Sequence, residues 1–161
     1  MGRVGRTGTN SGNMSSPQLS INQENYNKLV EAISIGDLIE GLEENGIKFT
    51  KENIVFIKKD EKGKTIWLET GNDNVGLKHT VKKHGSQFKN ALGISEDKIA
   101  STIANVITKE NYVWGTIDYV NGIKRINKYY KYNDTYYIFT GFGDNGFIIT
   151  SHPFKPKKGG K

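Results

Sequence analysis

The last third of the sequence constrains the fold most, because it alternates short strand-forming runs with tight-turn residues. The runs are VWGTIDYV, KRINKYYKY, TYYIFTGF and GFIITSHPF, all rich in β-branched and aromatic side chains. Asn-Gly, Asn-Asp and Gly-Asp-Asn-Gly separate them, and such residues reverse the chain in β-hairpins. The pattern predicts a four-stranded or larger antiparallel sheet. Because helices are predicted upstream, the expected fold class is α+β.

Two helices are predicted near the N-terminal side of this sheet. Residues 22–34 carry apolar side chains three and four positions apart, which is the spacing of one helix face. Residues 34–45 form a second apolar stretch, with Ser34 as its cap and Gly46 as its stop. We therefore expect two short helices that meet at Ser34.

A hairpin and two further helices are predicted between these helices and the sheet. Two β-prone runs in residues 53–69 flank Lys-Asp-Glu-Lys-Gly, which predicts a turn near Gly63. Apolar residues at helical spacing predict one helix over 75–92 and another over 95–111.

The length of 161 residues fits one ordinary domain. Residues 1–20 are mostly Gly, Ser, Thr and Asn and are expected to be a disordered leader or linker. We expect a single domain over 21–154, with a helical part at 21–61 and a core that carries the activity at 62–154. Residues 155–161 form a basic tail.

Charge is distributed unevenly along the chain. Residues 21–61 hold nine acidic and five basic residues, whereas residues 62–161 hold eight acidic and sixteen basic ones. A strongly basic region favours a polyanion such as nucleic acid, an anionic membrane surface or an acidic protein.

Several classes of site have no support in the sequence. There are no cysteines, so disulfides and thiolate metal sites are excluded. No apolar run is long enough to cross a bilayer, so no membrane integration is expected. The chain has no phosphate-binding loop, no Gly-x-Ser-x-Gly nucleophile motif and no paired carboxylates in its basic half. No metal and no cofactor are expected.

The segment GLKHTVKKHGSQF holds the first candidate site. His79 and His84 lie five residues apart on the predicted helix, so they point about 140° away from each other and suit a metal poorly. An imidazole near neutral pKa can act as a general base, and the neighbouring Lys78, Lys82 and Lys83 can bind a phosphate. The alternative is a solvated lysine face with structural histidines.

The segment GFIITSHPF holds the second candidate site. Thr150 and Ser151 offer two hydroxyls, and His152 offers an imidazole, at the end of a predicted strand. Alternation along a strand sends Thr150 and His152 to one face of the sheet and Ser151 to the other. The alternative is that these are ordinary strand-end residues.

Tyrosines of the predicted sheet are candidates for stacking on unpaired bases, although packing within the sheet is the more common use of such residues. They are Tyr129, Tyr130, Tyr132, Tyr136 and Tyr137.

Taken in order, FTKENIVFIKKDEKGKTIWLETGN, GLKHTVKKHGSQF and GFIITSHPF resemble the C-terminal toxin domains of bacterial polymorphic and contact-dependent inhibition toxins. The resemblance is to the superfamily of barnase, EndoU, colicin and RelE-like ribonucleases (BECR), and it covers residues 45–154. Leu77-Lys78-His79 and His84-Gly85 match the helix of that family, and residues 150–153 occupy its last strand. His152 stands where the family pattern has an aromatic residue.

The resemblance implies a metal-independent endoribonuclease toxin that cleaves RNA, with tRNA as the expected substrate. Attack by the 2′-hydroxyl would leave a 2′,3′-cyclic phosphate and a 5′-hydroxyl. The catalytic residues implied are His79, His84, Thr150 and Ser151, with Lys78, Lys82 and Lys83 on the phosphate and His152 and Tyr137 as additional candidates. Which histidine acts as base stays open.

The resemblance also implies how such a domain is used. It would be delivered as part of a larger secreted effector, act in the cytoplasm of a competing cell, and be held inactive by an acidic immunity protein. The domain would be a monomer or a toxin–immunity heterodimer. Three other functions stay open: a non-catalytic nucleic-acid-binding module, a DNase toxin, and an interaction domain for an acidic protein.

Overall fold

The computed structural model describes the backbone of residues 23–156 and the side chains of residues 34–156. The predicted leader, residues 1–20, and most of the predicted tail lie outside the described residues. The chain divides into two compact units, Met1–Asp37 and Leu38–Lys161. The boundary falls inside the segment 21–61.

The predicted pair of N-terminal helices is one helix, α2 (Gln23–Glu44). The expected break at Ser34 was wrong, because neither Ser34 nor Gly36 removes a backbone N–H, and each lowers helix stability by only about 1 kcal/mol or less. The stop at Gly46 is confirmed: this glycine has φ of 67° and its N–H bonds to the Glu43 carbonyl. No helix of the described residues is long and apolar enough to cross a membrane.

The predicted central hairpin and the helix after it are confirmed. Strands β2 (Ile54–Lys59) and β3 (Thr65–Glu69) pair antiparallel around Gly63, where φ is 82°. A short 3-10 turn, η1 (Lys51–Asn53), precedes them. Helix α3 (Gly76–Leu92) follows and ends at Gly93 in the left-handed conformation. The next helix is shorter than predicted: η2 (Glu96–Lys98) leads into α4 (Ile99–Val106).

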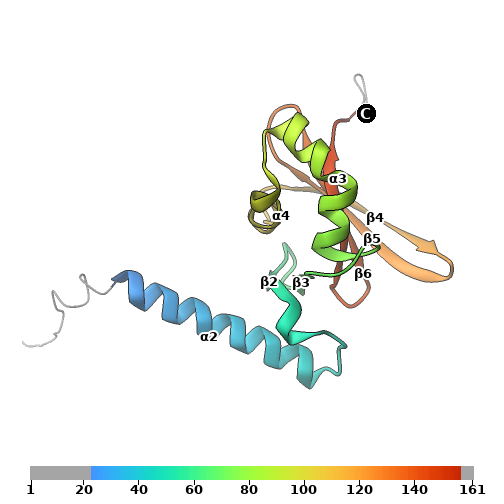
Figure 1. Cartoon of the computed structure of the whole chain (residues 1–161). Coiled ribbons are helices and arrows are strands. Elements are labelled where there is room, and N and C mark those ends of the chain that lie inside the picture. Colours follow the sequence, from blue (N-terminus) through green and yellow to red (C-terminus); the bar gives the residue numbers. More distant parts are fainter. Residues whose placement is uncertain (1–22, 157–161) are drawn as a thin grey trace, which may run out of the picture. The chain divides into compact units, whose positions relative to one another are not determined.

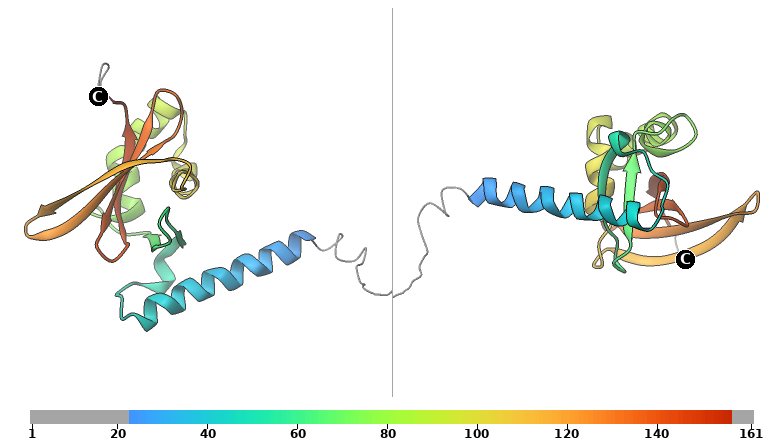
Figure 2. Two further views of the ribbon diagram at one scale, coloured as in Figure 1. Left: turned by 180° about the vertical axis from the view of Figure 1, so that it is seen from behind. Right: turned by 90° about the horizontal axis from the view of Figure 1, so that it is seen from below.

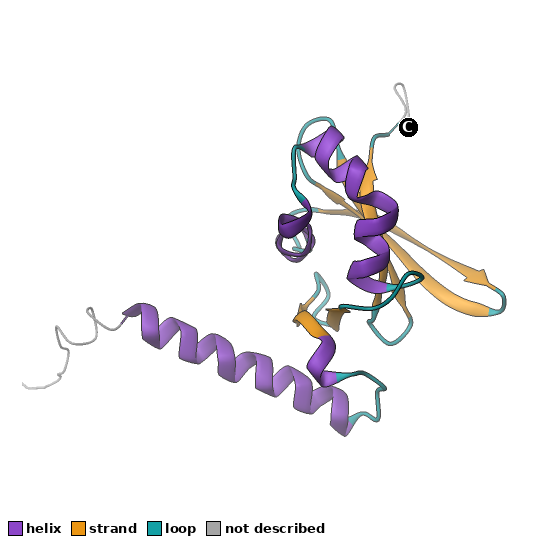
Figure 3. Cartoon of the chain, viewed as in Figure 1, coloured by secondary structure: helices purple, strands orange, loops and turns teal. Residues whose placement is uncertain are grey.

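The remaining strands form one antiparallel sheet in the order β4-β5-β6-β7 (Figure 1). Their bounds are β4 (Tyr112–Val120), β5 (Ile123–Lys131), β6 (Tyr137–Gly143) and β7 (Ile148–Phe154). Asn121 and Gly122 both have positive φ, as the tightest hairpin turn requires, and the β4–β5 hairpin extends beyond the other two strands (Figure 2). Helices followed by a four-stranded antiparallel sheet confirm the α+β class (Figure 3).

Two β-bulges decide which side chains reach each face of this sheet. One lies between Tyr112 and Trp114, so Tyr112 pairs with Tyr130 while Trp114 pairs with Tyr129 on the opposite face. The other lies opposite Gly141 and Phe142, where β7 has one extra residue. Bulges re-aim side chains in this way and are common beside functional sites.

The core lies between one face of the sheet and the elements packed on it. Tyr130, Ile138, Phe142 and Ile148 supply the sheet side of this cluster, and Phe88 from α3 is fully buried among them. Helix α3 packs along β7, the last strand of the sheet, and seen from behind the strands lie in front of α3 (Figure 2). The opposite face, called the outer face below, carries Trp114, Asn127, Tyr129, Phe139, Thr150 and His152.

Candidate functional site

All three histidines of the chain come together where α3 meets β7. The His84 ring centroid lies 4.7 Å from that of His152 and 6.0 Å from that of His79. His152 also packs on Phe139, at 4.8 Å, on the outer face. The two candidate segments of the sequence, 76–88 and 146–154, therefore meet at a single site, and His152 is its shared member.

Each of the three imidazoles is held through Nδ1 by an oxygen atom. The partners are the Asp73 carbonyl for His79 at 3.0 Å, the Gln87 side-chain oxygen for His84 at 2.5 Å, and the Pro153 carbonyl for His152 at 2.8 Å. Because these oxygens accept, each Nδ1 must carry the hydrogen. The Nε2 atoms have no hydrogen-bond partner among the described residues, so they are the atoms left for chemistry.

The loop before α3 fixes the position of His79. Asn72 accepts hydrogen bonds from the backbone N–H groups of Asn74 and Val75, which closes a compact turn that presents the Asp73 carbonyl. Gly76 has φ of 85°, and a Cβ there would lie 2.8 Å from the Glu69 carbonyl oxygen. Only glycine permits this close approach of α3 to β3.

His84 is the imidazole best suited to act as a base. Burial lowers its pKa, and the charges of His152, His79 and Lys83 lower the pKa further. The hydrogen bond to Gln87 acts in the opposite direction. A lowered pKa keeps the imidazole neutral, and therefore able to accept a proton, at pH values below its usual range.

The two predicted hydroxyls lie on opposite faces of β7. Ser151 is fully buried on the core face, where its hydroxyl donates to the Phe139 carbonyl at 2.8 Å and lies 3.2 Å from the Thr140 hydroxyl. Thr150 faces outward next to His152, and its buried Oγ1 has no partner among the described residues. The structure therefore places Thr150 on the same face of β7 as His152 and Ser151 on the opposite face.

Strand β5 brings further polar groups to the outer face. Asn127 lies across Gly141 from Thr150, and a Cβ on Gly141 would come within 3.6 Å of both side chains. Asn127 donates to Asp118 at 3.2 Å, yet its Oδ1 has no hydrogen-bond partner. Arg125 Nε makes no hydrogen bond either and has only a long ion-pair contact with Asp118 at 3.8 Å. Buried polar atoms without partners are uncommon and call for an explanation.

The three predicted phosphate-binding lysines are all exposed on α3. Lys82 forms an ion pair with Asp73 at 3.1 Å. Lys83 is the member of the set whose charge acts on His84. The backbone of Lys78 anchors the helix start through a hydrogen bond from its N–H to the Thr70 carbonyl.

The predicted stacking tyrosines divide between the two faces. Tyr130 is fully buried in the core and donates to Glu61, so it is not available for stacking. Tyr129 and Tyr137 both contact Trp114 on the outer face, with ring centroids 4.2 Å and 5.7 Å from the indole. Tyr137 therefore belongs to an aromatic group beside the site, and its ring does not contact the histidine rings.

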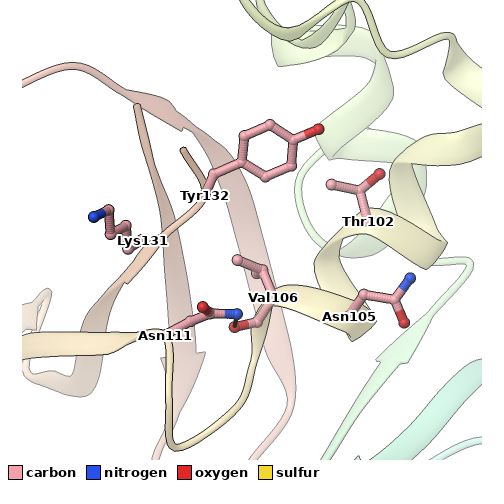
Figure 4. Close-up of a pocket in the computed structure, with 6 residues that line it drawn as sticks. All are labelled: Thr102, Asn105, Val106, Asn111, Lys131 and Tyr132. Carbon is pink, nitrogen blue, oxygen red and sulfur yellow. Dashed lines mark hydrogen bonds between the residues drawn. The ribbon is translucent and has the colours of Figure 1, made fainter. Parts of the chain in front are cut away.

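Two pockets lie outside the histidine cluster. A pocket of about 420 Å³ borders it, because its lining includes Gln87, which binds His84, and Pro153, which follows His152. Another of about 300 Å³ lies between α4 and the end of β5 and is lined by Thr102, Asn105, Val106, Asn111, Lys131 and Tyr132 (Figure 4). Asn111 crosses its base by donating to the Val106 carbonyl at 3.2 Å.

Several residues of the site escaped sequence reasoning. Trp114, Asn127 and Arg125 sit in runs whose composition predicts strands and no site. Alternation in KRINKYYKY nevertheless places Arg125, Asn127 and Tyr129 on one face. Gln87 lies three residues after His84, the spacing at which helix side chains meet. Strand alternation and helix spacing are thus signals that the sequence carries for these residues. The bulge that turns Trp114 to the outer face has no such signal.

Comparison with known proteins assigns no family. No protein-family model matches the chain, and no curated protein matches it. Within the part of the chain that the structure describes, no group of three His, Asp or Glu side chains is arranged to hold a metal ion. Function must therefore be argued from the geometry of the outer face.

Proposed function

We propose that the outer face beside α3 is the active site of an endoribonuclease that cleaves RNA by attack of the adjacent 2′-hydroxyl. One observation carries the proposal: three imidazoles, each with Nδ1 held and Nε2 without a hydrogen-bond partner among the described residues, gather where α3 meets β7. Thr150, two residues before His152 on the same face of β7, has a hydroxyl without a partner. Two imidazoles at one site can supply both the base and the acid that this reaction needs.

His84 acts as the base in this mechanism. Its neutral Nε2 takes the proton of the 2′-hydroxyl, and the 2′-oxygen forms a bond to the neighbouring phosphorus. The lowered pKa of His84, caused first by burial, supports this assignment because the ring is then neutral before reaction. Gln87 holds the ring in the tautomer that leaves Nε2 open.

His152 acts as the acid. As an imidazolium it gives its Nε2 proton to the leaving 5′-oxygen as the bond from phosphorus to that oxygen breaks. The products are a 2′,3′-cyclic phosphate and a 5′-hydroxyl. Thr150 and Lys83 stabilise the negative charge that builds on the phosphoryl oxygens, which is a large contribution in most phosphoryl-transfer sites. The family resemblance implies that the reaction needs no metal ion.

The biological setting is proposed from the resemblance and from charge. The domain would be the toxin part of a delivered effector, cleave RNA such as tRNA in the cytoplasm of a competing cell, and bind an acidic immunity protein. Sixteen basic against eight acidic residues in residues 62–161 suit both an RNA backbone and an acidic inhibitor.

The test is cleavage of total bacterial RNA and purified tRNA in EDTA by the full chain. His84→Ala and His152→Ala should each reduce the cleavage rate by about 10²- to 10⁴-fold, the usual range for loss of a general acid or base. His79→Ala should cost less, since its ring lies farther from His84 than that of His152.

Lys89→Ala is the matched control, because Lys89 is exposed on the last turn of the same helix. It should cleave like the parent chain. RNA that is bound but left intact, in EDTA and in Mg²⁺ alike, would refute the proposal and favour a non-catalytic binding module. Cleavage of DNA at a similar rate would favour a DNase toxin.

A further inference from the structure

The two tryptophans of the chain have opposite environments. Trp67 is fully buried, donates its indole N–H to Glu69 at 2.9 Å, and packs edge-on against Phe49 and Phe147. Trp114 is 37% exposed, and its indole N–H makes no hydrogen bond within the described residues. Buried tryptophan usually stabilises a core, whereas a half-exposed one on a sheet edge is typical of binding surfaces.

A β-bulge places Trp114 on the outer face. Without the extra residue, alternation would send Trp114 to the core side together with Tyr112. The indole instead stacks on Tyr129, with centroids 4.2 Å apart and planes 13° from parallel. Phe154 approaches both rings, at 6.4 Å from Trp114 and 5.1 Å from Tyr129.

These rings continue across the sheet to the histidines. Tyr129 lies 5.3 Å from Phe139, and Phe139 lies 4.8 Å from His152. The chain of ring contacts therefore runs from the edge strand β4 over β5, β6 and β7 to His84 on α3. None of Trp114, Tyr129, Phe139 and Phe154 belongs to either core cluster.

Lys131 and the edge strand β4 border this aromatic surface. Lys131 pairs in register with Tyr137, which pairs with Phe154, so the three share the row beyond Tyr129 on the outer face. The Lys131 side chain is 56% exposed, and its contact with Asp134 is long at 3.8 Å. Beyond Trp114 the sheet ends, since β4 pairs only with β5 among the described strands.

We infer that the aromatic array of Trp114, Tyr129, Phe139 and Phe154 binds unpaired nucleotides of the RNA whose phosphate reaches His84 and His152. This inference rests on the proposed function. Bases of a single strand expose their faces and stack on aromatic side chains, whereas bases in a duplex are already covered by their neighbours. The array thus selects single-stranded stretches such as loops, and Lys131 takes a flanking phosphate.

The experiment measures RNA binding in the His84→Ala background, where cleavage does not interfere. Fluorescence anisotropy with a labelled, unstructured ten-nucleotide RNA is compared with the same RNA annealed to its complement. The single strand should bind at least about 10-fold more tightly. Trp114→Leu, which keeps apolar bulk but removes the ring, should weaken this binding about 5- to 100-fold, as expected for loss of one stacked base.

Trp114→Phe keeps an aromatic face and should bind within about threefold of the parent, because stacking tolerates any ring. Tyr119→Leu is the matched control: Tyr119 is 66% exposed on the same strand, but alternation places it on the other face. It should bind like the parent. Fluorescence emission from the buried Trp67 reports whether the Trp114→Leu variant is folded. If that variant does not fold, Tyr129→Leu is measured instead.

Equal binding by Trp114→Leu, by Tyr129→Leu and by the parent, or equal affinity for duplex and single strand, would overturn the inference and leave a protein partner as the occupant. The outcomes separate the two proposals. If the aromatic variants bind single-stranded RNA more weakly but the chain without substitutions does not cleave RNA, only the nuclease proposal is refuted. If the chain cleaves RNA but the aromatic variants bind it as tightly as the parent, only the RNA-binding role of the aromatic array is refuted.

Discussion

The two faces of the C-terminal sheet treat polar groups in opposite ways. On the core face, Lys128 binds Asp60 at 2.9 Å and Glu61 at 2.5 Å, and Tyr130 donates to Glu61 at 2.7 Å. On the outer face, the side-chain oxygens of Asn127 and Thr150 have no hydrogen-bond partner. These residues directly precede Lys128 and Ser151, which lie on the core face.

This contrast separates groups that stabilise the fold from groups that can act on a ligand. A charge buried in a core must be paired, because leaving it alone costs several kcal/mol. A buried polar atom without a partner in the protein calls for an explanation, and a ligand that reaches it would supply one. The comparison predicts that mutations on the core face change stability and mutations on the outer face change activity.

The largest effect is expected at His152. His152→Phe keeps a ring on Phe139 and His84 but removes the proton donor, so the cleavage rate should fall about 10²- to 10⁴-fold while the melting temperature changes little. Rates on a defined tRNA and a thermal melt of the same sample check this. A His152→Phe variant with full activity would show that an aromatic residue suffices there and that the acid lies elsewhere.

The next effect is expected at Lys128. Lys128→Ala leaves two buried carboxylates without their cation and should lower the free energy of unfolding by about 3–5 kcal/mol. Urea unfolding at neutral pH measures it. At a temperature where the variant is still folded, its rate on RNA should match the parent, since Lys128 lies on the core face.

Acid unfolding supplies a second test of the same cluster. Burial alone would raise the pKa of Asp60, but hydrogen bonds from Lys128 and from the backbone of Lys64 and Lys62 hold the pKa below the ordinary value of 3.8. The Asp60 contribution is therefore complete above pH 3.8 and is lost as pH falls through the lowered pKa. Lys128→Ala removes a group that lowers this pKa, so acidification should cost the variant less of its remaining stability than it costs the parent, and an equal loss in both chains would contradict this account.

Thr150 and Ser151 form the closest matched pair, because two neighbouring hydroxyls face opposite ways. Thr150→Val should reduce the cleavage rate about 10- to 100-fold without destabilising the fold. Ser151→Ala should leave the rate unchanged and cost about 1–3 kcal/mol of stability, because the Thr140 hydroxyl loses its partner. The reverse pattern of rates and unfolding free energies would break the comparison between the faces.

The smallest effect is a shift in the pH profile of kcat/KM. Activity should fall on the acid side as His84 becomes protonated, at a pH below the ordinary histidine value. Lys83→Gln removes a charge that lowers the pKa of His84, so the acid limb should move to higher pH. Gln87→Leu removes the hydrogen bond that raises it, so the limb should move to lower pH. Lys89→Gln should not move it, and shifts in the same direction for both variants would refute the role of His84.

Much of the fold was predictable because its signals are local. The hairpin turn at Gly63, the helix over 75–92 and the strand pattern after residue 111 follow from turn residues and apolar spacing. The break predicted at Ser34 failed because serine and glycine weaken a helix without breaking it. The division of the chain at Asp37 and Leu38 has no local signal in the sequence.

The site was predictable in part, for a similar reason. Alternation correctly sent Thr150 and His152 to one face and Ser151 to the other. The meeting of His84 with His152 depends on how α3 packs along β7, and the exposure of Trp114 depends on a bulge. Both are tertiary features that spacing along the chain does not encode.

The most direct measurement of the central claim compares one RNA with a copy that carries 2′-O-methyl groups, both in EDTA. If the outer face works as proposed, the chain cleaves the unmodified RNA, the new ends are 2′,3′-cyclic phosphate and 5′-hydroxyl, and the modified RNA stays intact. Cleavage of both RNAs at the same rate, or ends that carry a 5′-phosphate, would contradict attack by the 2′-hydroxyl and the roles assigned to His84 and His152.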